Sequence, residues 1–277
     1  MIEQAVTTQT EIVYENTIFA EPIFHIGGFS VTNSLLTSWI AVVIILIISF
    51  KIKNKVNLVP RGLQNAMEAL IEFFLDLFDS ITGSREKSAK FFPFVFSFFL
   101  FIIICNLMGL LPGVGTIGQV VAEGGHKVFV PYLRGGTADL NATLALAIIG
   151  VVASHIFSVI SLGFWKYFNK FVNIKAFLEI PRKIKNDPAI ILVNPIKFLV
   201  GLMEIISELA KIASLSFRLF GNVFAGEVLL ASMSAMLAFG LPLPFMFLEV
   251  MVGVIQALIF AILILSYLSM MSVEEEH

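Results

Sequence analysis

Long uninterrupted runs of apolar residues alternate with short polar segments along this chain. Three runs of near-membrane length cover residues 35–50, 91–112 and 140–165, and none of them contains Asp, Glu, Lys or Arg. A helix rises 1.5 Å per residue and needs about 20 apolar residues to cross a bilayer. Each run therefore predicts a transmembrane helix, the first with the help of its uncharged flanks.

Two further apolar runs cover residues 189–239 and 245–271, and the GLPLP segment at 240–244 separates them. The first of the two is about twice as long as an upright span requires. Either a strong tilt or an unwound hairpin would fit such a length into a membrane. Hydropathy alone does not choose between the two.

Residues 62–83 have the pattern of an amphipathic helix instead of a span. Their acidic residues recur every three or four positions, so they share one helix face, and apolar residues share the other. An acidic polar face favours packing against protein at the membrane surface over docking on anionic lipid headgroups. The acidic residues are Glu68, Glu72, Asp76 and Asp79.

The composition agrees with a protein folded in lipid. Hydrophobic residues make up 58% of the 277 positions and charged residues 14%, whereas soluble domains are about one quarter charged. We therefore predict an all-α polytopic membrane protein with five membrane helices and one amphipathic surface helix, and we exclude a water-soluble enzyme. The net charge of −2 gives no indication of a nucleic-acid partner.

The distribution of basic residues predicts the orientation. Of 18 Lys and Arg residues, four follow the first span, three precede the second and six follow the third, while two lie in the loop at 113–139. Basic residues accumulate on the cytoplasmic side. We expect the segment 1–34 and the loop 113–139 to lie outside, and the helix 62–83 and the C-terminus inside. No cleavable targeting segment is expected, because the first 34 residues contain Glu but no Lys or Arg.

No motif for covalent chemistry is visible. The chain has one cysteine, Cys105, which excludes an intrachain disulfide and a zinc cluster built from thiolates. Phosphate-binding loops, zinc motifs and nucleophile elbows are also absent from the sequence. We expect no metal, no cofactor and no catalysis by the isolated chain.

The informative residues lie in the long run 189–239. Six polar residues there are spaced by three or four positions and form one stripe along a helix face. Intramembrane charge is costly and is by default a functional hypothesis. Glu227, nine residues after Arg218, faces the opposite side of the same helix. The stripe consists of Glu204, Ser207, Lys211, Ser214, Arg218 and Asn222.

Arg218 is the central residue of this stripe. Its guanidinium does not lose its proton, so at membrane depth it needs a carboxylate, water or carbonyl partner. One interpretation is a structural ion pair within the bundle. The other is a fixed positive charge that forces a passing protonated carboxyl to ionise, because a nearby opposite charge favours the ionised form.

The last run carries a second polar set. Glu249 and Gln256 are seven residues apart on one face, with Gly253 between them, and together with Glu227 they could line a hydrated path. Alternatively, Gln256 makes only an interhelical hydrogen bond and Glu249 is exposed at the membrane interface. His155, in the middle of the third span, is more often a packed histidine than a proton relay.

Three segments resemble subunit a of the F-type ATP synthase, the stator part of its membrane motor. They are SLSFRLFGNVFAGE, NLMGLLPG followed by TADLN, and QALIFAILILSYLSMMS. The resemblance implies two offset aqueous half-channels beside a ring of c subunits, and long tilted helices against that ring. It implies that Arg218 separates the half-channels and meets the ring carboxylate, that Asn222, Glu227 and Gln256 belong to the outer half-channel and the surroundings of Arg218, and that Glu204 and Ser207 lie near the inner exit.

In this chain Glu249 occupies a position where some bacterial relatives have His. The resemblance further implies that the chain is a non-catalytic subunit in a bacterial inner membrane, with the mitochondrial inner membrane as the alternative. Its partners would be the c ring, the peripheral-stalk b subunits, the rest of the complex and the lipid bilayer. The ion could be H⁺ or Na⁺. The rival functions are a self-contained antiporter, which needs related halves or interrupted helices, and a structural scaffold.

Overall fold

A computed structural model describes residues 12–13, 17–53, 57–111, 113–123, 126–165, 167–168, 190–237 and 240–271. The predicted ends of the long run, Ala189 and Phe239, lie outside these residues. Most of the basic stretch after the third span and the terminal Glu-Glu-Glu-His also lie outside the described residues.

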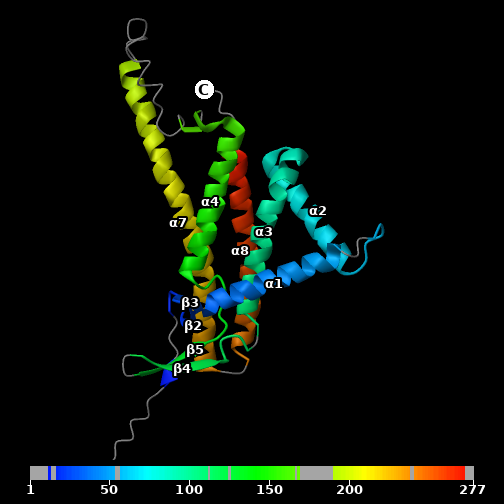
Figure 1. Cartoon of the computed structure of the whole chain (residues 1–277), viewed down its shortest axis with the longest axis vertical. Coiled ribbons are helices and arrows are strands. Elements are labelled where there is room, and N and C mark those ends of the chain that lie inside the picture. Colours follow the sequence, from blue (N-terminus) through cyan, green and yellow to red (C-terminus); the bar gives the residue numbers. More distant parts are fainter. Residues whose placement is uncertain are drawn as a thin grey trace, which may run out of the picture. The chain divides into compact units, whose positions relative to one another are not determined.

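Helices dominate the described residues and confirm the predicted fold class. They are α1 (Asn33–Lys53), α2 (Leu63–Thr82), α3 (Arg85–Gly109), α4 (Leu140–Leu162), α7 (Ile190–Met236) and α8 (Pro242–Met271) (Figure 1). Within the described residues, all except α2 are long and apolar enough to cross a membrane. The 20 residues of α2 are instead amphipathic, with Phe74 and Phe78 buried and Glu68, Glu72 and Asp76 exposed.

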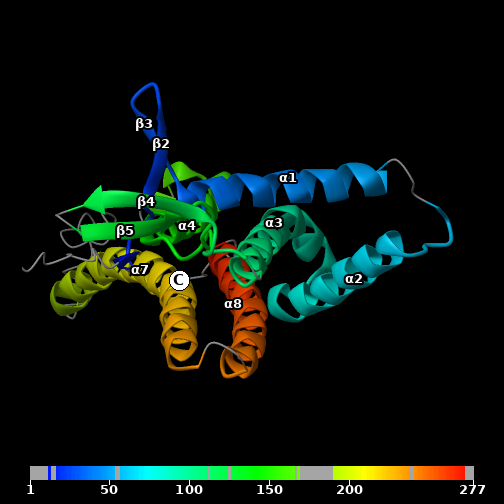
Figure 2. The same ribbon diagram turned by 90° about the horizontal axis from the view of Figure 1, so that it is seen from below.

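Short strands form in the two segments for which the sequence predicted no secondary structure. The hairpin β2 (Pro22–Ile26) and β3 (Phe29–Thr32) leads directly into α1 (Figure 2). The loop between α3 and α4 folds as the antiparallel pair β4 (Gly118–Glu123) and β5 (His126–Pro131), and β1 (Ile12–Val13) pairs with β5 in parallel.

The chain divides into two compact units. Unit 1 comprises residues 1–55, 100–142 and 219–257, and unit 2 comprises residues 56–99, 143–218 and 258–277. The helices α3, α7 and α8 each contribute one part to each unit. In α7, unit 2 ends at Arg218 and unit 1 begins at Leu219.

Unit 1 is held together by apolar packing and by polar contacts between its helices. Ala41 of α1 is buried against Cys105 and Met108 of α3. The second part of α7 and the first part of α8 form a helical hairpin (Figure 2). Asn106 of α3 donates a hydrogen bond to the carbonyl of Gly253 on α8 at 3.1 Å, which ties this hairpin to α3.

Unit 2 has an aromatic core. The ring of Phe74 on α2 lies 5.3 Å from that of Phe96 and 4.4 Å from that of Phe99, both on α3. The turn between these helices begins at Gly83, whose φ of 69° is a left-handed conformation that glycine adopts without strain. Phe98 packs on Phe260 of α8 with 5.7 Å between ring centroids. These edge and tilted contacts between phenylalanine rings are the arrangements that aromatic pairs prefer.

Candidate functional site

The guanidinium of Arg218 lies on an exposed face of α7. Within the described residues it makes one hydrogen bond, to Ser214 Oγ at 3.2 Å, and no ion pair. The same helix exposes Leu209 and Phe217, whose side chains are 64% and 61% accessible. A permanent cation therefore lies on a largely apolar surface without a carboxylate from its own described chain.

Unit 2 also contains a cluster of ionisable residues between α4 and α7. The carboxylate of Glu208 is buried and accepts a hydrogen bond from Lys211 Nζ at 2.7 Å. Its other oxygen lies 3.5 Å from Nε2 of His155 on α4. The hydroxyl of Tyr167 forms a short hydrogen bond with His155 Nδ1. His155 is thus a hydrogen-bonded residue in contact with a buried carboxylate.

A pocket of about 230 Å³ lies beside this cluster, and His155, Tyr167 and Glu208 are part of its lining. Burial, followed by the charges of Glu208 and Glu204, raises the pKa of the Tyr167 phenol to about 12. The phenol therefore stays protonated at neutral pH and can donate a hydrogen bond.

Unit 1 contains a smaller cavity of about 40 Å³ between α3, α7 and α8. Glu227 of α7, Glu249 of α8 and Asn106 of α3 line it, and Glu249 is only 8% exposed. A cavity of this volume has room for about two or three waters, and three polar side chains are available to bind them. The site can therefore hold water between two carboxyl groups.

Glu249 fits into this cavity because residue 226 is glycine. A Cβ built on Gly226 would overlap the carboxyl group of Glu249. The side chain of Glu249 has no hydrogen bond or ion pair with another described residue. Its carboxyl is thus available to water or to a proton.

A hydrogen bond joins α7 and α8 next to this cavity. Asn222 Nδ2 donates to Gln256 Oε1 at 2.7 Å. Gln256 is 3% exposed, and its Nε2 has no hydrogen-bond partner among the described residues. A buried amide donor without a partner is rare in proteins. Gln256 therefore retains an unused donor in addition to its interhelical bond.

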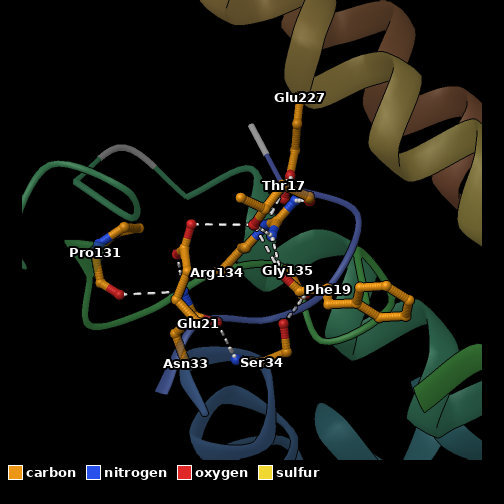
Figure 3. A network of polar contacts seen from close by, with 9 residues as sticks. All are labelled: Thr17, Phe19, Glu21, Asn33, Ser34, Pro131, Arg134, Gly135 and Glu227. Carbon is orange, nitrogen blue, oxygen red and sulfur yellow. Dashed lines mark hydrogen bonds and ion pairs between the residues drawn. The ribbon is translucent and has the colours of Figure 1, made fainter. Parts of the chain in front are cut away.

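The second carboxyl of the cavity, Glu227, is paired with Arg134 from the loop between α3 and α4. Arg134 Nε and Nη2 donate to Glu227 Oε2 at 3.0 and 2.9 Å. Arg134 is 5% exposed and also donates to the carbonyl of Thr17 at 2.8 Å (Figure 3). The two carboxyls of the cavity therefore differ in their partners.

Comparison with known proteins gives the family. The ATP synthase A chain family matches residues 35–269. The chain belongs to this family. It is 30% identical over 247 residues to the ATP synthase subunit a of Moorella thermoacetica, which covers 89% of this chain and 94% of the relative. It is 32% identical over 256 residues to that of Campylobacter jejuni, with 91% and 90% covered. With its five apolar helices, this member of the family is a multi-pass membrane protein.

The structure brings together some of the residues that the sequence predicted to belong to the functional site. Glu227 and Glu249 line one cavity, and Asn222 bonds Gln256, all in unit 1. The alternative of an exposed Glu249 is wrong, because α7 and α8 pack closely at Gly226 and cover its carboxyl. In unit 2, Ser207 is exposed and Glu204 half-buried on α7.

Arg134, Glu208 and Asn106 belong to these sites but were not predicted from the sequence, and neither was Tyr167, which bonds His155. Arg134 is one of two basic residues in its loop, and no sequence period connects it to Glu227, 93 residues later. Glu208 falls outside the polar stripe, although its spacing of three from Lys211 is that of a helical ion pair. Asn106 was a lone amide in an apolar run, and such a residue in a span signals a partner across the bundle.

Proposed function

We propose that this chain is the proton-translocating subunit a of an F-type ATP synthase. It couples proton flow across the membrane to rotation of a c-subunit ring and so to ATP synthesis. The isolated chain is non-catalytic. Its partners are the c ring, the peripheral-stalk b subunits, the remaining complex and the lipid bilayer. It is located in a bacterial inner membrane, with the N-terminus outside and the C-terminus in the cytoplasm.

The observation that carries the proposal is the exposed guanidinium of Arg218. In a bilayer, a permanent cation on an apolar face requires a counter-charge, and the described residues of its own chain supply none. A carboxylate on a second protein that packs against α7 would supply it. A ring of carboxyls that pass Arg218 one after another would supply such a counter-charge, because the guanidinium favours the ionised form of each carboxyl.

The two cavities, one in each compact unit, support two separate proton paths. Asn222, Glu227, Glu249 and Gln256 follow Arg218 in the chain and lie in unit 1, which we assign to the outer half-channel. Glu204 and Ser207 precede it and lie in unit 2, whose pocket at Glu208 suits the inner half-channel. A proton that enters by one path leaves by the other only after the ring has turned.

The membrane potential supplies the driving force for this movement, about 2.3 kcal/mol per charge per 100 mV. A self-contained antiporter is the rival function. It would bind its ion at a midplane site made from interrupted helices and would need no partner. The continuous helix from Ile190 to Met236 and the exposed position of Arg218 favour a site completed by another chain.

The test is ATP-driven acidification of inverted membrane vesicles that carry Arg218→Ala. We expect pumping to be lost while the complex assembles normally, and the passive proton leak to increase once the soluble catalytic head is removed. Arg61→Ala is the matched control, since this exposed arginine lies between α1 and α2. Normal pumping by Arg218→Ala would contradict the proposal. Pumping that requires Na⁺ would identify the sodium-coupled form of the same subunit.

A further inference from the structure

The two carboxyls of the unit 1 cavity are not chemically equivalent. Glu249 has no hydrogen bond or ion pair with another described residue, and its carboxyl faces the cavity. Glu227 Oε2 receives two hydrogen bonds from Arg134, at 3.0 and 2.9 Å. A charge-assisted pair with two donors on one oxygen is among the stronger polar contacts in proteins. Two glutamates that line one cavity are therefore held very differently.

Arg134 is in turn fixed by the segment that precedes α1. Its Nη2 donates to the carbonyl of Thr17 at 2.8 Å, and its Nη1 lies 3.4 Å from the carbonyl of Phe19. Thr17 Oγ1 is 3.1 Å from Glu21 Oε1, and Asn33, the first residue of α1, donates to Glu21 Oε2 at 2.9 Å. Figure 3 shows these contacts as one network. The guanidinium thus has a defined position and little freedom to leave Glu227.

We propose that Arg134 is a positioning residue that makes Glu227 a permanent counter-ion, so that Glu249 is the carboxyl that exchanges protons in this cavity. An arginine does not release its proton, so the pair with Glu227 persists while protons pass. Glu21, the other carboxylate of the network, is held by Thr17 and Asn33. The segment from Thr17 to Asn33 and the loop that carries Arg134 thereby acquire a role in the proton path.

This inference rests on the proposed function and makes Glu227 a support of the path instead of a carrier. The discriminating variant is Arg134→Gln combined with Glu227→Gln, which replaces the ion pair by two neutral amides. We expect each single variant to lower ATP-driven pumping at least tenfold, because each leaves one charge of the pair without its partner. The double variant should pump within about threefold of wild type, with an unchanged pH profile.

Glu249→Gln is the matched comparison, because it removes a carboxyl from the same cavity without breaking an ion pair. We expect Glu249→Gln to lower pumping at least tenfold. Adding Arg134→Gln and Glu227→Gln to this variant should not restore pumping. An assembled double variant that pumps as poorly as Glu227→Gln alone would overturn the inference. If Arg218→Ala still abolishes pumping, the proposed function survives that outcome.

A second measurement needs no substitution. Dicyclohexylcarbodiimide modifies carboxyls that are protonated in apolar surroundings, and mass spectrometry of the intact complex after digestion locates the label. We expect this chain to be labelled at Glu249 and not at Glu227. Label on Glu227, or none on Glu249 under conditions that label ring carboxyls, would overturn the inference even if the variants do not assemble.

Discussion

Asn106, a polar side chain inside the apolar helix α3, has partners in two other segments. Asn106 accepts a hydrogen bond from Thr137 at 2.5 Å and donates one to Gly253. An unpaired amide in hydrocarbon would cost several kcal/mol, so such residues persist where the fold provides a partner. The polar residues of unit 1 therefore define both the packing of its helices and the walls of its cavity.

Gly226 gives a prediction at the residue scale, because its missing side chain leaves the space that Glu249 fills. Gly226→Ala should displace the Glu249 carboxyl and lower ATP-driven pumping by roughly tenfold, since a small misplacement of a reacting group is costly. Pumping by inverted vesicles measures the effect. The Glu249→Asp substitution shortens the side chain that fills this space. Gly226→Ala should therefore lower pumping less in a Glu249→Asp background than in the wild type. Equal losses in both backgrounds would contradict this explanation.

Between elements, close approach of α4 and α8 in unit 2 depends on Gly150. A Cβ at this position would overlap the terminal methyl of Ile264. We expect Gly150→Ala to destabilise the protein by about 1–3 kcal/mol, as overpacking of a filled core does. Thermal denaturation of the detergent-solubilised complex checks this.

Ile264→Val should recover part of the stability that Gly150→Ala loses, because it removes the methyl that the new Cβ meets. Ala145→Ser, at an exposed position of α4, serves as the control for a substitution on the same helix. A Gly150→Ala protein as stable as the control would show that these helices are not in contact at this point.

Tyr167 links the end of α4 to the cluster at Glu208 and predicts a pH effect. Burial and then the charges of Glu208 and Glu204 raise its pKa to about 12. In the unfolded chain the pKa of a tyrosine is about 10. Because the pKa of Tyr167 is higher in the folded state, this residue stabilises the folded state fully below pH 10, and its contribution is lost as the pH rises through 12. The tyrosinate absorbance that Tyr167→Phe removes should therefore appear near pH 12. If this absorbance appeared near pH 10 instead, it would contradict the partial burial of Tyr167 beside Glu208.

At the scale of the whole molecule, the exposed face of α7 is the surface at which we expect the proposed c ring to dock. Cys105 is the only cysteine and is buried, so Cys105→Ser provides a background for cross-linking. Cysteine at the exposed positions Ser207 and Ser214 should cross-link to the c subunit in membranes, as judged by electrophoresis. Cysteine at Ser216, which is 1% exposed beside Thr143, should not. The same yield at all three positions would contradict this docking face.

The amino-acid pattern alone indicates that the chain folds in lipid and that its fold is all-α. Apolar runs such as residues 140–165 have one stable form in lipid, because only a helix satisfies its own backbone hydrogen bonds there. The spacing of charges within the run 189–239 likewise placed Arg218 and Glu227 on opposite faces of one helix, since helical geometry is local. The motif around Arg218 also indicated the family to which the chain was found to belong.

The contacts between residues far apart in the sequence become visible only in the folded chain. The pair of Arg134 with Glu227 and the approach of Glu249 to Gly226 join segments far apart in the sequence, and no periodicity encodes such contacts. The short strands before α1 and between α3 and α4 were also unpredicted, because strand pairing depends on a partner elsewhere in the chain. Local patterns set each helix and its faces, whereas the partner of each buried charge follows from packing, which depends on all segments together.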